Sequence, residues 1–495
     1  MATFFGKTMA EGIMSEIDIA ILKKKSLTGI VTLTSRTFLL QLVAFGATFL
    51  LTIFLEPSIF GIFYVVSAII SFLGYFSDIG LAAALIQKKE ELSAEDLSTT
   101  FTIQQTMVGT IVIISYIFSP QIAHFYSLDA AGLALLRVLI ISFFVSSLKT
   151  IPSVLLERKL EFNKLVIPNI LETLGFYLTA VILAWKGWGI TSFTWAAAIR
   201  AGVGLISMYA ISPWSIRVGI SQTAAKGLLR FGLPFQLNSF LALLKDDLLT
   251  IFLGKVLPYA QVGYIGWAKK WAEVPLRLIM DSVIRVTFPA YSRLQESKEL
   301  LGKAIEKTLF GLSLSIFPIS MGLLFFVKPL IEIIPRYGKW EPAIISFYLF
   351  AVASVISSLS TPLTNALNAV GKIKVTLWLM VMWTTLTWAL TVTLIPLFGF
   401  HGVALGMLLI TSTVAVVVAL VKRFTAFSFW GSIRVPVTGV VLQAVVYTGL
   451  LWVLPHTLLF YIPIGLLGVI LYGIIVWSLE RERIVRFVEI FQGKS

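Results

Sequence analysis

The strongest constraint on this fold is a series of apolar segments, each long enough to cross a bilayer. A helical span needs about 20 apolar residues. Of the 495 residues, 58% are hydrophobic and only 13% are charged, against about 25% charged in soluble domains. Ten of the 39 Lys and Arg residues lie inside these segments, where an ionised side chain is costly unless it is solvated or paired. The sequence therefore predicts an integral membrane protein with cationic groups in its interior.

The same segments predict the fold class. Open sheet edges cannot be satisfied in lipid, and no segment alternates as a barrel strand does, so we expect an all-α integral membrane protein. We count fourteen transmembrane helices, arranged as two six-helix lobes and two C-terminal helices. The predicted spans are 27–55, 58–85, 98–118, 132–153, 163–185, 190–211, 229–255, 259–290, 302–328, 340–362, 373–398, 400–422, 435–454 and 459–479.

Basic residues outside the spans predict the orientation, because short cytoplasmic loops carry an excess of Lys and Arg. With a cytoplasmic N-terminus, 25 basic residues lie inside and only four lie outside. We therefore expect a multi-pass protein of the cell inner (plasma) membrane with both termini cytoplasmic. This asymmetry accounts for most of the net charge of +14, so no nucleic-acid partner is expected.

An internal repeat predicts the lobes. Leu50-Leu-Thr-Ile-Phe-Leu55 recurs unchanged as Leu248-Leu-Thr-Ile-Phe-Leu253, each time at the outer end of a span that opens a six-helix group. Six spans are an even number, so both groups should face the same way across the membrane. The predicted order is a cytoplasmic N-terminal segment at 1–26, an N-lobe at 27–211, a cytoplasmic linker at 212–228, a C-lobe at 229–422, two further spans within 435–479 and a cytoplasmic tail at 480–495.

The eighth predicted span carries five ionisable side chains on one narrow helical face, because their spacings are 3, 4, 4 and 4 residues. They form either a self-neutralising ladder or one wall of a water-filled cavity that holds an anion. Pro275 removes a helical donor on this span and predicts a kink or broken turn. Lys269 lies off this face and should leave an uncompensated positive charge. The five residues are Lys270, Glu273, Arg277, Asp281 and Arg285.

Two further groups of charges are expected to form ion pairs. Lys245, Asp246 and Asp247 are consecutive in the seventh span and point to different faces, so one of them should pair with a neighbour in the eighth span. In the first lobe, Arg36 and Asp78 lie at similar depth near the inner side, and we expect them to pair with each other.

The predicted spans have a positive charge surplus, because they contain ten basic and only six acidic residues. Arg200, midway along the sixth span, has no evident acidic partner at its depth. A cavity with this surplus suits a phosphate, a pyrophosphate or an acidic glycan. The candidate substrate-binding cations are Arg200, Lys269, Lys270, Arg277, Lys149 and Arg36. The candidates for ion coupling or charge pairing are Asp246, Asp247, Glu273, Asp281 and Asp78.

Motifs of enzymes and cofactor sites are missing from the sequence. The chain has no cysteine, and its three histidines are widely separated, without metal-ligand spacing. Ser93-Ala-Glu-Asp96 has the pattern of a helix cap. We therefore expect a transporter rather than an enzyme, with no catalytic residue, no metal and no cofactor.

Four motifs, in order along nearly the whole chain, resemble the Wzx-type polysaccharide flippases, and within them the colanic-acid-type branch. This family transports lipid-linked oligosaccharides and belongs to the multidrug/oligosaccharidyl-lipid/polysaccharide superfamily. The motifs are Phe76-Ser-Asp-Ile-Gly-Leu81 with Leu85-Ile-Gln-Lys-Lys-Glu90, Leu155-Leu-Glu-Arg-Lys-Leu-Glu-Phe-Asn-Lys164, Val283-Ile-Arg-Val-Thr-Phe-Pro-Ala-Tyr291 and Tyr337-Gly-Lys-Trp-Glu-Pro342.

The resemblance implies fourteen helices, two lobes arranged as a V and a cation-lined central cavity that alternates between leaflets. It also implies that the substrate is an undecaprenyl-pyrophosphate-linked oligosaccharide or polysaccharide repeat unit, moved from the cytoplasmic to the outer leaflet. The expected partners are this polyprenyl-pyrophosphate-linked glycan, membrane lipids, H⁺ or Na⁺ as coupling ion, and other glycan-assembly proteins.

Two alternative functions fit the sequence less well. A multidrug or organic-ion exporter of the same superfamily would favour twelve helices and an acidic cavity, and the sequence has neither pattern. A membrane glycan polymerase or ligase belongs to another class and needs a sizeable outer loop with catalytic residues. The longest predicted outer loop, at about 119–131, has no Lys or Arg.

Overall fold

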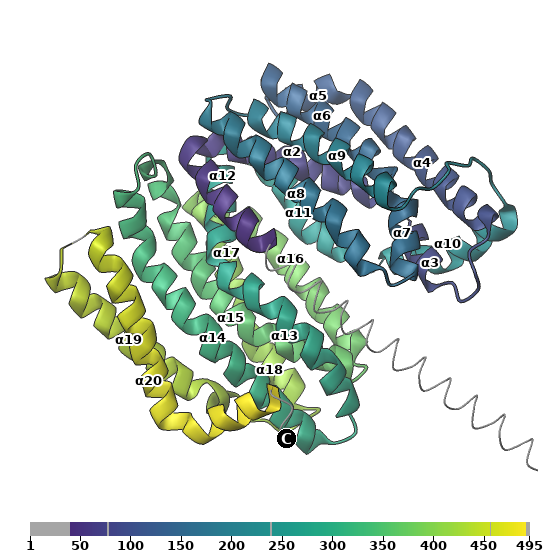
Figure 1. The fold of residues 1–495 in the computed structure, drawn as a ribbon. Coiled ribbons are helices and arrows are strands. Elements are labelled where there is room, and N and C mark those ends of the chain that lie inside the picture. The colour runs from purple at the N-terminus through teal and green to yellow at the C-terminus, as the bar shows by residue number, and fades with distance from the viewer. Residues whose placement is uncertain (1–39, 77–78, 238–239, 456, 492–495) are drawn as a thin grey trace, which may run out of the picture. The chain divides into compact units, whose positions relative to one another are not determined.

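The protein is described by a computed structural model in which residues 40–76, 79–237, 240–455 and 457–491 are placed. All the regular elements among these residues are helices (Figure 1). Eleven helices in this part of the chain are long and apolar enough to cross a membrane. The predicted all-α membrane fold is therefore confirmed.

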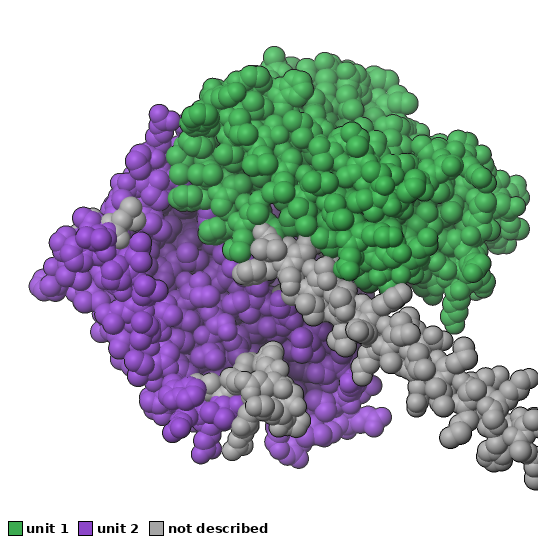
Figure 2. Space-filling view, viewed as in Figure 1, with its two compact units in different colours: residues 1–55, 65–243 green, residues 56–64, 244–495 purple. Residues whose placement is uncertain are grey.

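The chain divides into two compact units, coloured separately in Figure 2. Unit 1 comprises residues 1–55 and 65–243, and unit 2 comprises residues 56–64 and 244–495. The division falls inside helix α2 (Pro57–Tyr75), whose first residues belong to unit 2 and whose remainder belongs to unit 1.

Unit 1 is a bundle in which helices near and distant in the sequence pack side by side. Helix α8 runs along α9, α6 packs against α4 and α9, and α10 covers α3 and α4. Leu81, Leu85, Phe101 and Ile151 form a buried core around α3 and α7. Besides part of α2 and the helix Leu40–Phe54, the elements are α3 (Leu81–Gln87), α4 (Ala94–Ile117), α5 (Ser119–Phe125), α6 (Ala130–Ser147), α7 (Thr150–Arg158), α8 (Phe162–Trp185), α9 (Thr191–Ile211) and α10 (Gln222–Leu237).

Unit 2 is organised around two long helices, α14 and α15. Helices α12 and α13 both pack on α15, while α19 packs on α14 and on α20. One of its cores includes Ile305, Leu309, Leu363 and Leu379, all nearly fully buried. The elements are α11 (Phe240–Val256), which begins at the unit boundary, α12 (Tyr259–Ala272), α13 (Val274–Arg293), α14 (Lys298–Ile333), η1 (Gly338–Ala343), α15 (Ile344–Ala369), α16 (Ile373–Phe398), α17 (His401–Thr411), α18 (Val414–Lys422), α19 (Phe429–Val453) and α20 (Leu458–Phe491).

Three of the fourteen predicted spans differ from the eleven long apolar helices of the described chain. The span 27–55 is described only from residue 40. The span 229–255 corresponds to α10 and α11, which lie on either side of residues 238–239, outside the described part, and the span 259–290 corresponds to α12 and α13. The span 259–290 is divided into two shorter helices, and both spans carry several charges, which reduces their apolar length. The count of fourteen stays a prediction.

Two local predictions are confirmed. The eighth span is broken next to Pro275, because α12 ends at Ala272 and α13 begins at Val274, with Glu273 between them. Ser93 caps α4: its hydroxyl accepts a hydrogen bond from the backbone N–H of Asp96, whose carboxylate accepts one from the backbone N–H of Ser93 in return.

Within unit 2, two glycines allow the start of α2 to lie directly against α12. A Cβ on Gly61 would overlap the backbone carbonyl of Tyr259, and one on Gly263 would overlap that of Pro57. Such close backbone approach is how small residues stabilise helix pairs in lipid, where the hydrophobic effect gives no drive for association. Phe60 and Trp340 pack edge to face beside this contact, with ring centroids 5.5 Å apart.

We expect Gly263→Val to destabilise the protein by about 1–3 kcal/mol or more, because the new side chain must displace a backbone carbonyl rather than a flexible side chain. Thermal unfolding in detergent should show a clearly lowered Tm. The matched control is Gly473→Val, since nothing lies within 4 Å of the Cβ position of Gly473. Equal melting temperatures for the two variants would contradict the proposed close packing.

Candidate functional site

A buried charge cluster lies inside unit 1, and we call it the Glu172 cluster. It consists of Glu172 on α8, Arg200 on α9, and Lys149 at the break between α6 and α7. The sequence places these residues well apart, but α8 packs along α9 and also contacts α7. The interruption of the fourth span at Lys149 brings its ammonium group to the carboxylate.

The carboxylate of Glu172 is the centre of this cluster and is only 6% exposed. Its Oε1 accepts a hydrogen bond from Nζ of Lys149, and its Oε2 lies 3.9 Å from Nε of Arg200. Gly204 provides the space, because a Cβ at that position would overlap the Glu172 side chain. One buried anion is thus shared by two cations, which leaves the cluster with a net positive charge.

The guanidinium of Arg200 remains accessible although it belongs to this cluster. Its side chain is 59% exposed, and Cζ lies 5.9 Å from the centre of the Phe176 ring. A planar guanidinium held from one side in this way can still bind a phosphate or carboxylate with its other donors. The expectation that Arg200 has no acidic partner is wrong, because Glu172 from the neighbouring helix provides one.

A second group of charges lies in unit 2. Nζ of Lys269 on α12 is 3.9 Å from Oδ1 of Asp246 on α11. This confirms that one of the consecutive charges in the seventh span pairs with the eighth, and it corrects the expectation that Lys269 is uncompensated. Both side chains remain substantially exposed, so the pair is accessible. Asp247 follows on α11 and is partly buried.

The five-residue face of the eighth span is partly self-neutralised. Glu273, at the junction of α12 and α13, accepts two hydrogen bonds at Oε2, from Nε of Arg277 at 3.1 Å and from Nη2 at 2.7 Å. The Arg277 side chain is 65% exposed, whereas Glu273 is 14% exposed. Lys270 lies in the last turn of α12, and Asp281 belongs to α13, but its side chain lies outside the described part.

The remaining predicted charges lie apart from these two groups or outside the described residues. Arg36 and Asp78 fall outside the described residues, and so does their expected ion pair. Arg137 donates a hydrogen bond from Nε to Ser119 Oγ at 3.0 Å and lies over the Tyr116 ring, so it joins α6 to the end of α4 and α5. Lys328 pairs loosely with Glu332 on an exposed face.

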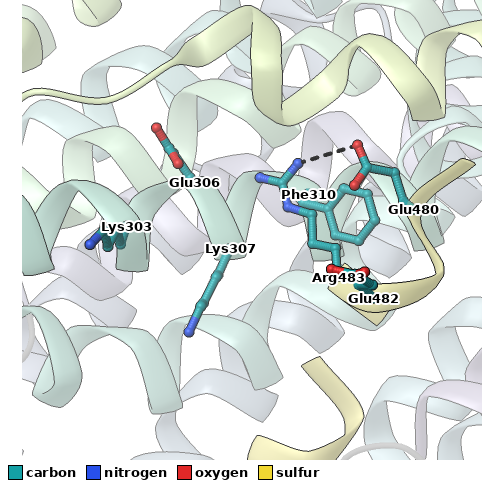
Figure 3. Close-up of a pocket in the computed structure, with 7 residues that line it drawn as sticks. All are labelled: Lys303, Glu306, Lys307, Phe310, Glu480, Glu482 and Arg483. Atoms are coloured by element: carbon teal, nitrogen blue, oxygen red, sulfur yellow. Dashed lines mark ion pairs between the residues drawn. The ribbon is translucent and has the colours of Figure 1, made fainter. Parts of the chain in front are cut away.

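A separate cavity of about 450 Å³ lies in unit 2 between the first turns of α14 and the end of α20 (Figure 3). Helix α20 loses helical geometry at Glu480, which pairs with Arg483 at 3.8 Å. The Arg483 guanidinium lies 4.6 Å from the centre of the Phe310 ring. The formal charges of the described lining residues cancel, so this described cluster joins α20 to α14 without the positive surplus of an anion site. The lining residues are Lys303, Glu306, Lys307, Phe310, Glu480, Glu482 and Arg483.

Comparisons with known proteins agree with this architecture. Lipid II flippase MurJ in its inward closed conformation superposes with a TM-score of 0.72 at 14% identity, covering 90% of this chain and 99% of MurJ. Lipopolysaccharide biosynthesis protein WzxC of Escherichia coli (strain K12) is 26% identical over 363 residues, 71% of each chain. Succinoglycan biosynthesis transport protein ExoT of Rhizobium meliloti (strain 1021) is 23% identical over 327 residues, 66% of this chain and 65% of ExoT.

The fold and the charged clusters thus define a multi-pass helical membrane protein with the fold of MurJ. A sequence model of the family described as polysaccharide biosynthesis protein matches residues 50–345, more than half of the chain. The chain belongs to this polysaccharide biosynthesis protein family. The resemblance to the polysaccharide flippases found in the sequence is thereby confirmed.

Removing the central carboxylate should destabilise unit 1. Glu172→Ala leaves Lys149 largely buried without its counter-charge, and breaking a buried pair in this way costs about 3–5 kcal/mol. We expect a strongly lowered Tm in detergent and a partial recovery when Lys149→Met is added. Glu91→Ala is the control, because Glu91 is exposed. A Glu172→Ala protein as stable as this control would show that the pair contributes nothing.

Proposed function

We propose that this protein is a flippase that moves polyprenyl-pyrophosphate-linked glycan units, with undecaprenol as the expected lipid, from the cytoplasmic to the outer leaflet of the inner membrane. It would be a transporter and not an enzyme. Membership of a polysaccharide biosynthesis family supports this proposal, as do relatives named for lipopolysaccharide biosynthesis and for succinoglycan transport. The MurJ-like fold supports it only at the level of architecture.

The observation that carries the proposal is the accessible Arg200, held from one side by a buried carboxylate. A diphosphate carries several negative charges, and it can bind the exposed donors of Arg200 beside the positive charge of Lys149. Exposed Arg277 and Lys269 offer similar donors in unit 2. With Lys270 and Arg36, these residues form the proposed cationic central cavity.

The proposed cycle is alternating access, in which the predicted lobes 27–211 and 229–422 move against each other with both termini on the cytoplasmic side. H⁺ or Na⁺ is the proposed coupling ion. The carboxylates proposed to bind it, or to pair with the cations, are Asp246, Asp247, Glu273, Asp281 and Asp78. Other glycan-assembly proteins and membrane lipids are the proposed partners.

The test is flipping of a fluorescent polyprenyl-pyrophosphate oligosaccharide in proteoliposomes that contain the purified protein. We expect transport by the wild type, and at least a tenfold loss in Lys269→Ala/Lys270→Ala/Arg277→Ala, because each lost charged hydrogen bond contributes roughly 1.5–3 kcal/mol. Arg200→Ala should cause a similar loss through unit 1.

The control is Lys89→Ala/Arg217→Ala/Lys226→Ala, which removes three exposed cations outside the predicted spans. Its transport should match the wild type. Transport is then measured under a pH gradient and under a sodium gradient. The gradient that accelerates transport identifies the coupling ion. A wild-type protein that moves none of several glycans under either gradient would reject the function, and full transport by the triple variant would reject the site.

A further inference from the structure

A small polar cavity lies wholly within unit 2, and the charged clusters described above do not include it. Its volume is about 180 Å³, and we call it the Lys245 pocket. Lys245 comes from α11, two serines and two threonines come from α15, and Trp383 comes from α16. The pocket is completed by Thr411 at the end of α17 and by Thr413, which lies between α17 and α18.

The pocket lies beside an irregular turn in a membrane helix. In the span His401–Lys422, the regular geometry of α17 and α18 is interrupted for two residues, Ser412 and Thr413, near the middle of the span. Irregular turns within membrane helices tend to occur where the backbone lines a cavity or a binding site. The irregular turn and the pocket therefore support each other as signs of a ligand site.

The threonine hydroxyls of the pocket donate their protons to backbone carbonyls of their own chain segments. Thr361 donates to Ser357 O at 2.9 Å, Thr364 to Thr361 O at 2.9 Å, and Thr411 to Leu408 O at 2.9 Å. Thr413 donates to Ile410 O at 2.6 Å and accepts a hydrogen bond from Nε1 of Trp383 at 2.9 Å. A hydroxyl that donates to its own helix presents acceptor lone pairs to the cavity. A ligand that fits should therefore carry several hydrogen-bond donors.

Among the described residues that line the pocket, Lys245 is the only ionisable group, so this described lining has one positive charge and no negative one. The ammonium of Lys245 has donors and no acceptor, so it calls for an anionic group on the ligand. Trp383 adds an aromatic side chain, an amphipathic surface of the kind that lines ligand pockets. Hydroxyl donors, one carboxylate and an apolar ring face occur together in a sugar acid.

We propose that the Lys245 pocket binds one uronic acid residue of the transported glycan, with Lys245 on its carboxylate and the threonine oxygens accepting from its hydroxyls. The volume of about 180 Å³ admits one sugar ring and excludes an oligosaccharide. This inference rests on the proposed function, because it assigns the sugar of the substrate while the phosphate contacts remain with Arg200 and the other cations.

The first test is binding of free sugars to the purified full chain in detergent, measured by saturation-transfer NMR with glucuronate and glucose as probes. Glucuronate should give a signal and glucose a much weaker one. Lys245→Met should reduce glucuronate binding about tenfold, as expected for a lost charged hydrogen bond, and Thr361→Val should also reduce it. Lys255→Met, on the same helix and outside the pocket, is the matched control.

Transport provides the second test. Lys245→Met should slow flipping of a polyprenyl-pyrophosphate glycan that contains glucuronate about tenfold, and leave the same lipid with a neutral glycan near the wild-type rate. Glucuronate binding that survives in Lys245→Met, or equal slowing of both lipids, would overturn the pocket's assignment. If wild-type protein moves neither lipid, the proposed function fails, while the NMR result still decides whether the pocket binds a sugar acid.

Discussion

The desolvated carboxylate of Glu172 determines how unit 1 can be built, because a charge in the membrane interior must be matched wherever the helices place it. Lys149 and Arg200 supply the match from two other elements. The pair with Lys149 is buried and structural, whereas Arg200 is more than half exposed. The same anion therefore fixes the packing of α8 and α9 and keeps one guanidinium oriented toward the accessible surface.

Much of the fold could be predicted from the sequence, because bilayer thickness is so restrictive. Hydrophobic length and the need to satisfy every backbone polar group are enough to place helices, and each predicted span falls on one or two helices within the described residues. The break beside Pro275 followed from one missing donor. In the region of α10 to α13, charged residues shorten the apolar segments, so the sequence determines the number of membrane crossings less well.

The charge partners were predictable only where the chain itself limits the choice. Asp246 and Lys269 lie on consecutive predicted spans, which must be neighbours, and their pairing was expected. Arg200 and Glu172 also lie on consecutive spans, but the depth estimated from the sequence placed them apart. The Lys245 pocket could not be predicted, because its lining residues come from four helices, α11, α15, α16 and α17, and carry no spacing signal in the sequence.

The assignment of α2 to both units has a consequence for how the protein is made. Gly61 and Phe60 find their partners on α12 and η1, so the start of α2 cannot complete its packing until residues 259–340 have left the ribosome. Until then, the surface of α2 around Gly61 has no packing partner on α12, and it is exposed to lipid or to non-native helix contacts. A fragment that ends at residue 243 would reproduce this intermediate, because it carries the first turns of α2 without their partners on α12 and η1.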